Sequence, residues 1–497
     1  MTRAATTTHT YPVTGNAFGL PLLIISALQL MVVLDGTVVN LALARIQVEL
    51  GLTDSLRSWI VTSYALAYGG LLLLGGRLGD VFGRKRTFLI GVSMFTLASL
   101  ACGLANGAGV LLVARVIQGI GAAVASPTAM ALIVVTFAPG KPRNQAFSVF
   151  AMMTGLGSVL GLVVGGALTE ASWRWIFLIN VPIGVFIVGL GVKYLFSTGQ
   201  SEKMALDVRG AVLATGASTL LVFGMTEGGV GFTAPVIGSV VLGVVLLIGF
   251  FLSQRKAANP VLPLGMFAHR SRTFVFVSLL LVGALLMAMT VQVALFVQEV
   301  LGYGPLTAGL AFIPFAFALA TGSAISGRLA EVVSPRWIVA GGGVILIGGF
   351  VFSSMLDEHA SYLPDLLIPI LVIGVGLGIV LIPLTLSVVA GVKPTEVGPL
   401  TATSLVCQTL GGPLGLAAVT AYAEMRTRSR LGSAFDTLNR SALDDAARAA
   451  LGDGYTGSLL ICAGLAVVVV ILVVAFVKFT PEDIREGKAA EAAAQRG

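Results

Sequence analysis

Charged residues are scarce in this chain. Only 11% of its 497 residues are Asp, Glu, Lys or Arg, whereas a soluble domain carries about 25%. Because 56% of the residues are hydrophobic, a soluble fold of this length could not keep that much apolar surface away from water. The composition excludes a soluble globular protein and predicts a chain surrounded mostly by lipid.

Cysteine and histidine are also rare, with three of each. Cys102, Cys407 and Cys462 fall inside apolar stretches, with neither metal-ligand spacing nor the pattern of a disulfide framework. The histidines are scattered, and the glycine-rich GVGLGI at 374–379 lies within an apolar run rather than in a phosphate-binding loop. The sequence therefore predicts no metal site, no cofactor and no enzyme activity.

Long apolar runs are abundant. A transmembrane helix needs about 20 predominantly apolar residues, and fourteen runs meet that length or approach it. We predict spans at 18–43, 58–78, 87–106, 109–134, 145–169, 173–196, 210–228, 234–254, 273–297, 306–326, 336–356, 364–389, 397–423 and 456–478. This pattern indicates an all-α integral membrane protein.

Lysine and arginine predict the orientation of these spans. The connections on one side contain only Arg45, Arg57, Arg174 and five arginines in the long segment 424–455, whereas the other side and both tails hold most of the rest. Positive residues in short loops favour the cytoplasm. Both termini are therefore predicted to be cytoplasmic.

The connection between the second and third spans is dense in both charge and glycine. It reads GRLGDVFGRKRTF over 76–88. The orientation rule explains its basic residues, but it explains neither Asp80 nor the glycines, which permit tight turns and close backbone approach. The stretch fits the pattern G-x-L-x-D-x-x-G-R-K/R, and in this the chain resembles the major facilitator superfamily.

The resemblance implies a contact for Asp80 with the opposite half of the protein. The carboxylate would lie against the N-terminus of a helix beginning near KPTEVGPL at 393–400, where the helix dipole and unpaired N–H groups favour an anion. The predicted cytoplasmic gate consists of Gly76, Asp80, Gly83, Arg84 and Lys85.

A degenerate copy of this loop occurs at 326–336, as SGRLAEVVSPR. Its Glu331 corresponds to Asp80, while Ser334 replaces the second glycine and puts a gate role in doubt. Such an internal repeat is typical of transporters built from two related halves. The predicted organisation is a cytoplasmic tail at 1–17, a six-helix half at 18–196, two inserted helices with cytoplasmic linkers at 197–272, a second six-helix half at 273–478 that includes the external loop 424–455, and a cytoplasmic tail at 479–497.

Asp35 and Arg115 lie deep within predicted spans, at similar depth in their outer halves. A charge at the centre of a bilayer costs from about 3 to more than 10 kcal/mol, and usually marks a pathway or a partner. One interpretation is a buried ion pair that locks two helices together. The other is proton exchange at Asp35, governed by opposing effects of desolvation and of Arg115.

Both stretches also match motifs of drug exporters. LDGTVVNLAL at 34–43 resembles the first-helix signature of proton-coupled drug exporters, with Ala44 in place of the final proline, and LLVARVIQGIGAA at 111–123 resembles the fourth-helix motif. In that family the arginine is tied to proton coupling, so the resemblance assigns this role to Asp35 and Arg115.

A glycine series in the fifth span resembles the antiporter motif of the superfamily. TGLGSVLGLVVGGAL at 154–168 keeps its glycines but has Leu162 in place of a proline. Packing alone could explain the series. The predicted antiporter glycine helix carries Gly157, Gly161, Gly165 and Gly166.

WRWIFLINVPIG at 173–184 is more specific, because it is similar to the hallmark of the fourteen-span drug:proton antiporters of EmrB/QacA type. SPTAMALIV and GLVVGGALTE are most like the EfpA-like efflux proteins of mycobacteria. The resemblance implies a major facilitator fold of two six-helix halves plus two inserted helices, in a bacterial cytoplasmic (inner) membrane.

The function implied is proton-coupled multidrug efflux of amphipathic or cationic compounds by alternating access. The energy source would be the proton gradient, with no cofactor, no nucleic-acid partner and a monomeric protein. An alternative on the same scaffold is a lipid or envelope-precursor exporter or flippase, because a largely uncharged cavity open to the bilayer would accept acyl chains.

Two outer features are less distinct. Glu299 at the end of the ninth span is predicted to be solvated, with substrate or proton contact as the alternative, and the segment 424–454 has the periodicity of an external amphipathic helix. Candidate residues of the substrate cavity are Gln118, Met152, Met153, Asn180, Gln292, Phe296, Glu299 and Phe312.

Overall fold

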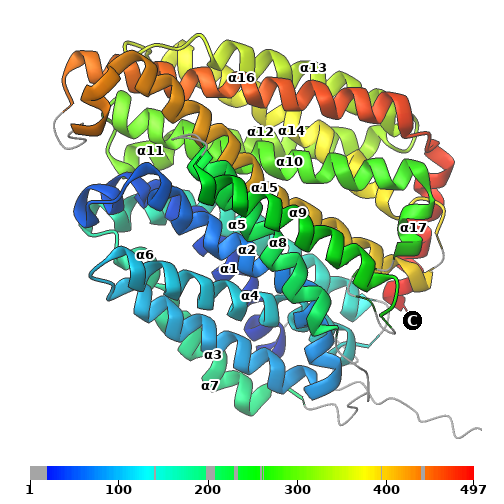
Figure 1. Ribbon diagram of the computed structural model, residues 1–497. Helices are drawn as coiled ribbons and strands as arrows, with labels where there is room; N and C mark the ends of the chain where they lie inside the picture. Colours follow the sequence, from blue (N-terminus) through cyan, green and yellow to red (C-terminus); the bar gives the residue numbers. More distant parts are fainter. Residues whose placement is uncertain are drawn as a thin grey trace, which may run out of the picture.

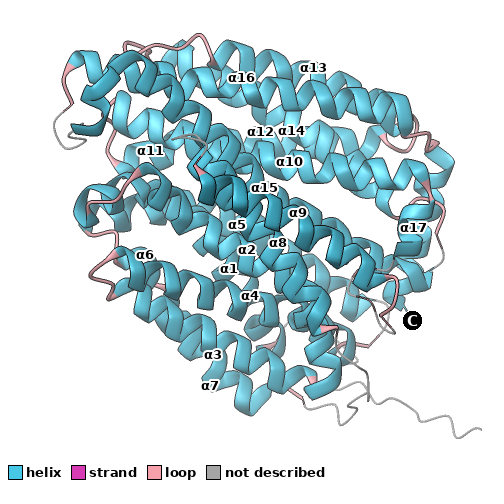
Figure 2. Cartoon of the chain, viewed as in Figure 1, coloured by secondary structure: helices cyan, strands magenta, loops and turns pink. Residues whose placement is uncertain are grey.

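The computed structural model describes residues 19–138, 141–196, 207–228, 233–257, 260, 262, 264–392, 394–437 and 443–496. Within these ranges the ordered elements are helices, and no strand occurs (Figure 2). Fourteen helical segments are long and apolar enough to cross a membrane, which confirms the predicted count.

The first half of the chain forms a bundle of six spans, coloured from blue through cyan to blue-green in Figure 1. Its helices are α1 (Leu20–Leu50), α2 (Asp54–Phe82), α3 (Arg84–Gly103), α4 (Ala108–Thr136), α5 (Lys141–Ala171), and a last span divided into α6 (Trp175–Leu178) and α7 (Asn180–Tyr194).

The second half forms a matching bundle, coloured green to red. Its spans are α10 (Arg270–Leu295) with η2 (Phe296–Val300), α11 (Pro305–Ala311) with α12 (Ile313–Leu329), α13 (Pro335–Ser353), η3 (Tyr362–Leu366) with α14 (Leu367–Val388), α15 (Pro394–Leu431) and α16 (Asp445–Phe476).

Two further spans, α8 (Val208–Gly228) and α9 (Ala234–Gln254), pack together between the halves. The first of them contacts both α2 and α15. Short elements complete the fold: η1 (Leu264–Ala268), η4 (Gly432–Thr437) and the C-terminal helix α17 (Pro481–Arg496).

Local sequence explains several helix ends. The Thr53 side chain accepts a hydrogen bond from the backbone N–H of Leu56 at the start of α2, and Asp444 does the same for Ala447 at the start of α16. Gly83 has φ +89°, so the break between α2 and α3 needs a residue without a Cβ.

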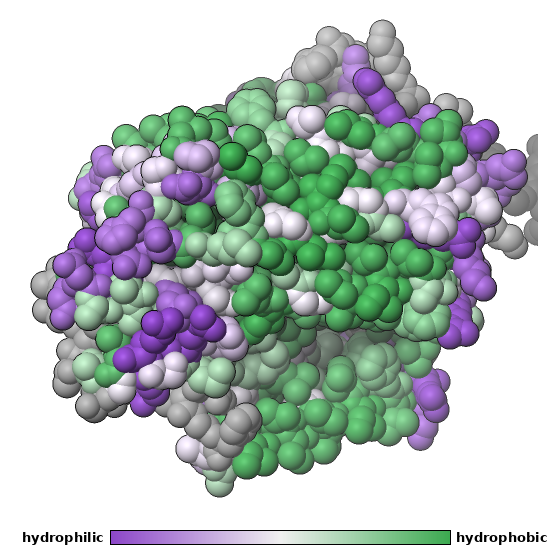
Figure 3. Space-filling view, turned by 90° about the horizontal axis from the view of Figure 1, so that it is seen from above, coloured by the Kyte–Doolittle hydropathy of each residue, from purple (hydrophilic) through white to green (hydrophobic). Residues whose placement is uncertain are grey.

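The helices end at two opposite faces of the molecule. The tail side is the end where α1 begins and α16 ends, and the far side is the end where α1 ends and α16 begins. Figure 3 shows a broad apolar band with hydrophilic residues gathered at its two ends, as expected for a protein that spans a bilayer.

The apolar core is continuous between the halves toward the far side. One cluster of buried residues includes Val38 and Leu162 of the first half together with Phe296 and Phe312 of the second. A second cluster, around Phe88, lies within the first half toward the tail side. The far-side ends of the two halves are therefore packed into one another.

The prediction of a separate amphipathic helix over 424–454 is wrong. The span α15 continues to Leu431, and α16 starts at Asp445, so both transmembrane helices absorb most of that segment. Arg426 of α15 and Asp453 of α16 join these extensions through two hydrogen bonds of 2.8 Å each. Residues 438–442 lie outside the described part of the chain.

Candidate functional site

Asp35 of α1 and Arg115 of α4 form an ion pair in the interior of the first half. The Arg115 Nη1 atom lies 2.7 Å from Asp35 Oδ2, and their side chains are 1% and 0% exposed. The contact expected from their matching depth is therefore present. Both are enclosed by apolar helices, so neither charge has access to bulk water in this arrangement.

Two neutral side chains complete the environment of the Asp35 carboxylate. Gln118 Nε2 donates to Oδ1 at 2.7 Å, and Asn180 Nδ2 donates to the same oxygen at 3.0 Å. Gln118 also donates to Ser99 Oγ at 2.8 Å. Four helices, α1, α3, α4 and α7, thus place polar atoms around one carboxylate, and we call Asp35, Ser99, Arg115, Gln118 and Asn180 the Asp35 cluster.

Arg115 has further partners that hold its charge in place. Its Nε donates to the Ile60 carbonyl of α2 at 2.9 Å, and its Nη1 donates to Gln118 Oε1 at 2.7 Å. The guanidinium lies 4.4 Å from the centre of the Tyr64 ring, a cation–π distance. Arg115 therefore keeps several favourable contacts even when Asp35 carries no charge.

This arrangement suits reversible protonation. A buried carboxylate is costly unless it is paired, and a proton on Asp35 would remove that charge while leaving Arg115 its carbonyl, amide and ring contacts. The side-chain amide oxygen of Asn180, Oδ1, is buried without a hydrogen-bond partner. It could accept the O–H of a neutral Asp35 after a change of side-chain rotamer.

A second ionic cluster crosses between the halves at the far side. Arg57 of α2 lies 2.9 Å from Glu299 Oε1 of η2, with side chains 3% and 7% exposed. Arg57 also pairs with Asp54 at 3.2 Å, and Tyr455 of α16 donates to Glu299 Oε2 at 2.6 Å. The expectation of a solvated Glu299 is therefore wrong, because packing of the two halves buries it.

The predicted gate residues lie together at the tail side. Asp80 Oδ1 is 3.2 Å from Arg84 Nη2, and both side chains are about one-third exposed. Lys85 Nζ donates to the Val192 carbonyl of α7 at 2.8 Å. These bonds lie within the first half, and the side chains at the start of α15, where the Asp80 contact was expected, belong to the residues not described. Gly76 packs near Pro127 of α4.

The glycines of α5 separate into two sets. A Cβ added to Gly157, Gly161 or Gly165 would come within about 3 Å of α1 atoms, at Val33, Thr37 and Val38 respectively. A Cβ on Gly166 would instead meet the backbone of Pro305 and Leu306 in the second half. The first three thus seat α5 on α1, and the fourth allows the halves to touch at the far side.

The eight candidate residues of the substrate cavity do not share one cavity in the described structure. Gln118 and Asn180 belong to the Asp35 cluster, and Glu299 to the far-side ion pair. Met152 is 54% exposed on α5 and Met153 is partly buried, whereas Phe312 is buried between α11 and α12.

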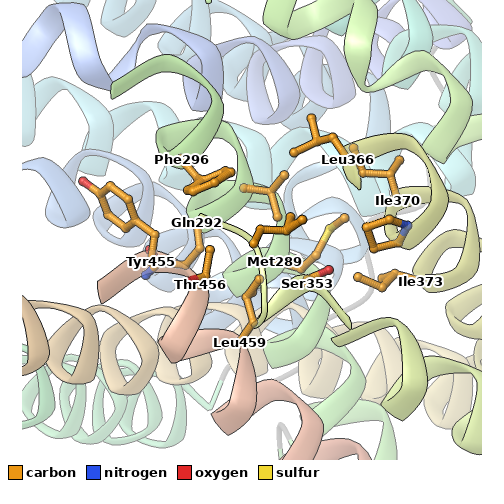
Figure 4. Close-up of a pocket in the computed structure, with 13 residues that line it drawn as sticks. Met289, Gln292, Phe296, Ser353, Leu366, Ile370, Ile373, Tyr455, Thr456 and Leu459 are labelled. Atoms are coloured by element: carbon orange, nitrogen blue, oxygen red, sulfur yellow. The ribbon is translucent and has the colours of Figure 1, made fainter. Parts of the chain in front are cut away.

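Gln292 and Phe296 line a small pocket of the second half, seen in Figure 4. The free volume is about 10 Å³, roughly room for one water molecule. Ile370 and Ile373 face it from α14, and Tyr455 borders it with its hydroxyl directed away from them (Figure 4). The Gln292 Oε1 atom is buried without a partner.

This pocket occupies the place that the Asp35 cluster has in the first half. Both lie among the first, third, fourth and sixth spans of their half. Aligning Gly119 of α4 with Gly374 of α14 puts Ile370 at the position of Arg115 and Ile373 at that of Gln118. The sequence repeat in the tail-side loops did not reveal this correspondence.

Comparison with known proteins places the chain among transporters. Residues 25–416 match the family model described as Major Facilitator Superfamily. A relative from Mycobacterium tuberculosis, named "Uncharacterized MFS-type transporter EfpA", is 43% identical over 97% of this chain and 91% of that protein. The puromycin resistance protein of Streptomyces alboniger is 39% identical over 80% of each chain.

A third relative, the cephamycin export protein of Amycolatopsis lactamdurans, is 35% identical over 78% of this chain and 81% of its own. Among solved structures, a bacterial homologue of the human lysosomal transporter Spinster, inward-facing and unoccupied, aligns with a TM-score of 0.67 at 18% identity. It covers 95% of this chain and 97% of that one, which supports the fold alone.

Proposed function

This chain belongs to the Major Facilitator Superfamily, and we propose that it exports small amphipathic compounds in exchange for protons. The observation that carries the proposal is the Asp35 cluster, a fully buried carboxylate with a cation and two amide donors inside a membrane-spanning bundle. Relatives named for puromycin resistance and cephamycin export support efflux of small molecules.

The proposed orientation puts the tail side in the cytoplasm of a bacterial cell. Its loops carry Arg77, Arg84, Lys85 and Arg86 in one short connection, and positive residues favour the cytoplasmic face. Packing between α5 and α11 joins the halves at the far side, so this arrangement represents the state closed toward the outside.

Proton exchange at Asp35 would couple to this alternation. With Asp35 charged, the ion pair to Arg115 ties α1 to α4. In a state of the cycle that admits water to Asp35, a proton from outside would neutralise the carboxylate, weaken that tie and let α1 move relative to α4. Because α5 is seated on α1 through its glycines, movement of α1 would carry α5 and its contact with α11.

The test uses everted membrane vesicles with an acid interior and ethidium as the probe. Asp35→Asn keeps the size of the side chain but cannot exchange a proton. Uptake driven by the pH gradient should therefore fall at least about tenfold, because the group that carries the proton is missing. The matched control is Asp357→Asn, which changes a far-side carboxyl that accepts a hydrogen bond from the local His359 N–H.

Full coupled uptake by Asp35→Asn would contradict the proton-carrying role. If wild-type vesicles fail to take up ethidium, the proposed class of substrate is wrong.

A second candidate is movement of a membrane lipid. The outer surface of α3 and α4 carries an apolar groove of about 550 Å³, lined by Leu97, Val110, Val113 and neighbouring residues. An acyl chain fits that chemistry. Transfer of a fluorescent phospholipid between leaflets of proteoliposomes, absent with Asp35→Asn, would favour this function over drug export.

A further inference from the structure

We propose that Glu299 is a second proton-exchanging carboxylate of the transport cycle, and that its protonation releases the far-side closure. The inference rests on the proposed proton-coupled export, in which the far side faces outward. Glu299 lies in the ninth span and Asp35 in the first span, so the proposed role of Glu299 is separate from that of Asp35.

The ion pair of Arg57 with Glu299 is a direct bond between the halves. The atoms Nη1 and Oε1 are 2.9 Å apart, and the residues lie 242 positions apart in the chain. Because both side chains are almost fully buried, water screens their attraction very little. Outward opening must separate them, so this bond opposes opening for as long as Glu299 is charged.

Each partner retains a contact inside its own half when the halves separate. Arg57 keeps the carboxylate of Asp54 and the Gln47 Oε1 atom, and Glu299 keeps the hydroxyl of Tyr455. The arginine therefore stays beside an anion when the halves separate. Opening is consequently easier when Glu299, rather than Arg57, changes its charge.

A crevice on the far side gives Glu299 access to protons. It has a volume of about 520 Å³, and Glu299 is part of its wall. Three other charged side chains line it: Arg45 and Glu49 of α1, and Arg448 of α16. A proton from water in this crevice would add to a carboxylate oxygen of Glu299, giving a neutral acid and breaking the ion pair without any other reaction.

The backbone around Glu299 is unusual. Residues Phe296–Val300 form a π-helix at the end of α10, and π-turns inside helices are frequent at functional sites. This turn directs Phe296 into the pocket of the second half and Glu299 into the interface with Arg57. Tyr455 borders that pocket and donates to Glu299, so one residue connects the two features.

The experiment measures opening of the far side as a function of pH. Cysteines replace Leu104 and Met355, exposed residues just beyond the far-side ends of α3 and α13, after Cys102, Cys407 and Cys462 have been changed to alanine. Spin labels on the purified full-length protein in lipid nanodiscs report the distance between the halves. In the reference protein with native Glu299, we expect the long-distance population to grow as the pH falls from 8 to 5.

Three variants test whether the charge of Glu299 controls opening of the far side. Glu299→Gln mimics the protonated acid and should hold the open population high at every pH. Tyr455→Phe removes a hydroxyl that favours the charged carboxylate while leaving the ion pair in place. It should move the midpoint of opening about one unit toward higher pH. Glu358→Gln, in the far-side turn after α13, is the matched control and should match the reference protein.

An unchanged pH response in Glu299→Gln would overturn the inference, as would a pH-independent distance in the reference protein. The inference would also be overturned if the pH midpoint of opening in Tyr455→Phe equalled that of the reference protein. Vesicle transport distinguishes this failure from failure of the proposed function: if wild-type uptake is driven by the pH gradient and Glu299→Gln keeps the normal pH response, only the role of Glu299 is wrong. Absence of any coupled uptake by wild type would instead remove the proposed function.

Discussion

The two halves differ in what lies among their first, third, fourth and sixth spans. In the first half, the side chains among α1, α3, α4 and α7 are those of Asp35, Arg115 and Gln118. In the second half, the side chains among α10, α13, α14 and α16 include those of Met289, Ile370 and Ile373. The helices correspond, but the first half holds an ion pair and its amide donors at this place, whereas the second holds mainly apolar side chains together with the neutral polar groups of Gln292, Ser353, Tyr455 and Thr456. Among the described residues that line the two places, the ion pair lies in the first half alone.

The difference has an energetic reason. A buried ion pair contributes little net stability compared with good apolar packing, since desolvation of both charges offsets their attraction. The second half has no ion pair among the residues that line the corresponding pocket. The first half retains the costly one, which is the arrangement expected where a proton has to be bound and released.

The largest expected effect comes from removing one charge of the ion pair in the first half. Arg115→Met would leave Asp35 buried without its cation, and we expect a loss of about 3–5 kcal/mol in the free energy of unfolding. Titration with SDS in mixed micelles measures this. The double variant Asp35→Leu with Arg115→Met should recover most of the stability while losing the proposed proton-coupled transport. A double variant as unstable as the single one would mean that the cluster is needed for folding.

The next largest effect comes from introducing a charge into the pocket of the second half. Ile370→Arg places a guanidinium at the position equivalent to Arg115 but without a carboxylate, and should destabilise the protein by about 3 kcal/mol. Its control, Ile370→Val, only removes a methylene and should cost about 1 kcal/mol. Equal stabilities of the two variants in the same SDS titration would show that the pocket is more hydrated than its lining suggests.

The smallest effect concerns the two tail-side loops. Asp80 pairs with Arg84 of its own half, and its counterpart Glu331 pairs with Lys488 of α17 at 2.8 Å. The Lys488 ammonium holds the pKa of Glu331 below its usual value of 4.5. Any stabilisation is therefore present at neutral pH and is lost as the pH falls below 4.5 through the lower, folded-state value.

Because Glu331 is exposed, we expect Lys488→Ala to leave the thermal unfolding midpoint at pH 7 unchanged within error. Limited trypsin digestion at Arg485 should rise no more than about twofold, since the buried Ile484 side chain still anchors α17. Complete release of the helix in Lys488→Ala would show that the ion pair, and not Ile484, holds α17 in place.

Much of the fold was predictable from the sequence because span lengths follow from bilayer thickness. The contact of Asp35 with Arg115 was also predictable, since two opposite charges at equal depth have few other partners. Asn180 was recognised as polar within its span, but its hydrogen bond to Asp35 of α1 depends on how the helices pack, which periodicity does not show.

The bond of Arg57 to Glu299 lies beyond sequence reasoning for a different reason. Each residue falls near a predicted membrane surface, where a single charge is ordinarily solvated. Only the docking of one half on the other buries both. The extension of α15 to Leu431 was missed because its last turns are rich in arginine, which hydropathy excludes from a span.

The π-turn at Phe296–Val300 makes the protein sensitive to the loss of a single residue at this place, even where no functional side chain is changed. A π-turn holds one residue more than an α-helical turn spanning the same rise, so it behaves as a one-residue insertion that the fold has accommodated. Deleting Val297 would remove this extra residue, restore α-helical geometry and leave Phe296 and Glu299 two positions apart, at about 200° around the helix axis. Phe296 and Glu299 could then no longer point into the pocket and the interface at once. Loss of this single residue, with every charged residue retained, is therefore expected to break the ion pair between Arg57 of the first half and Glu299 of the second.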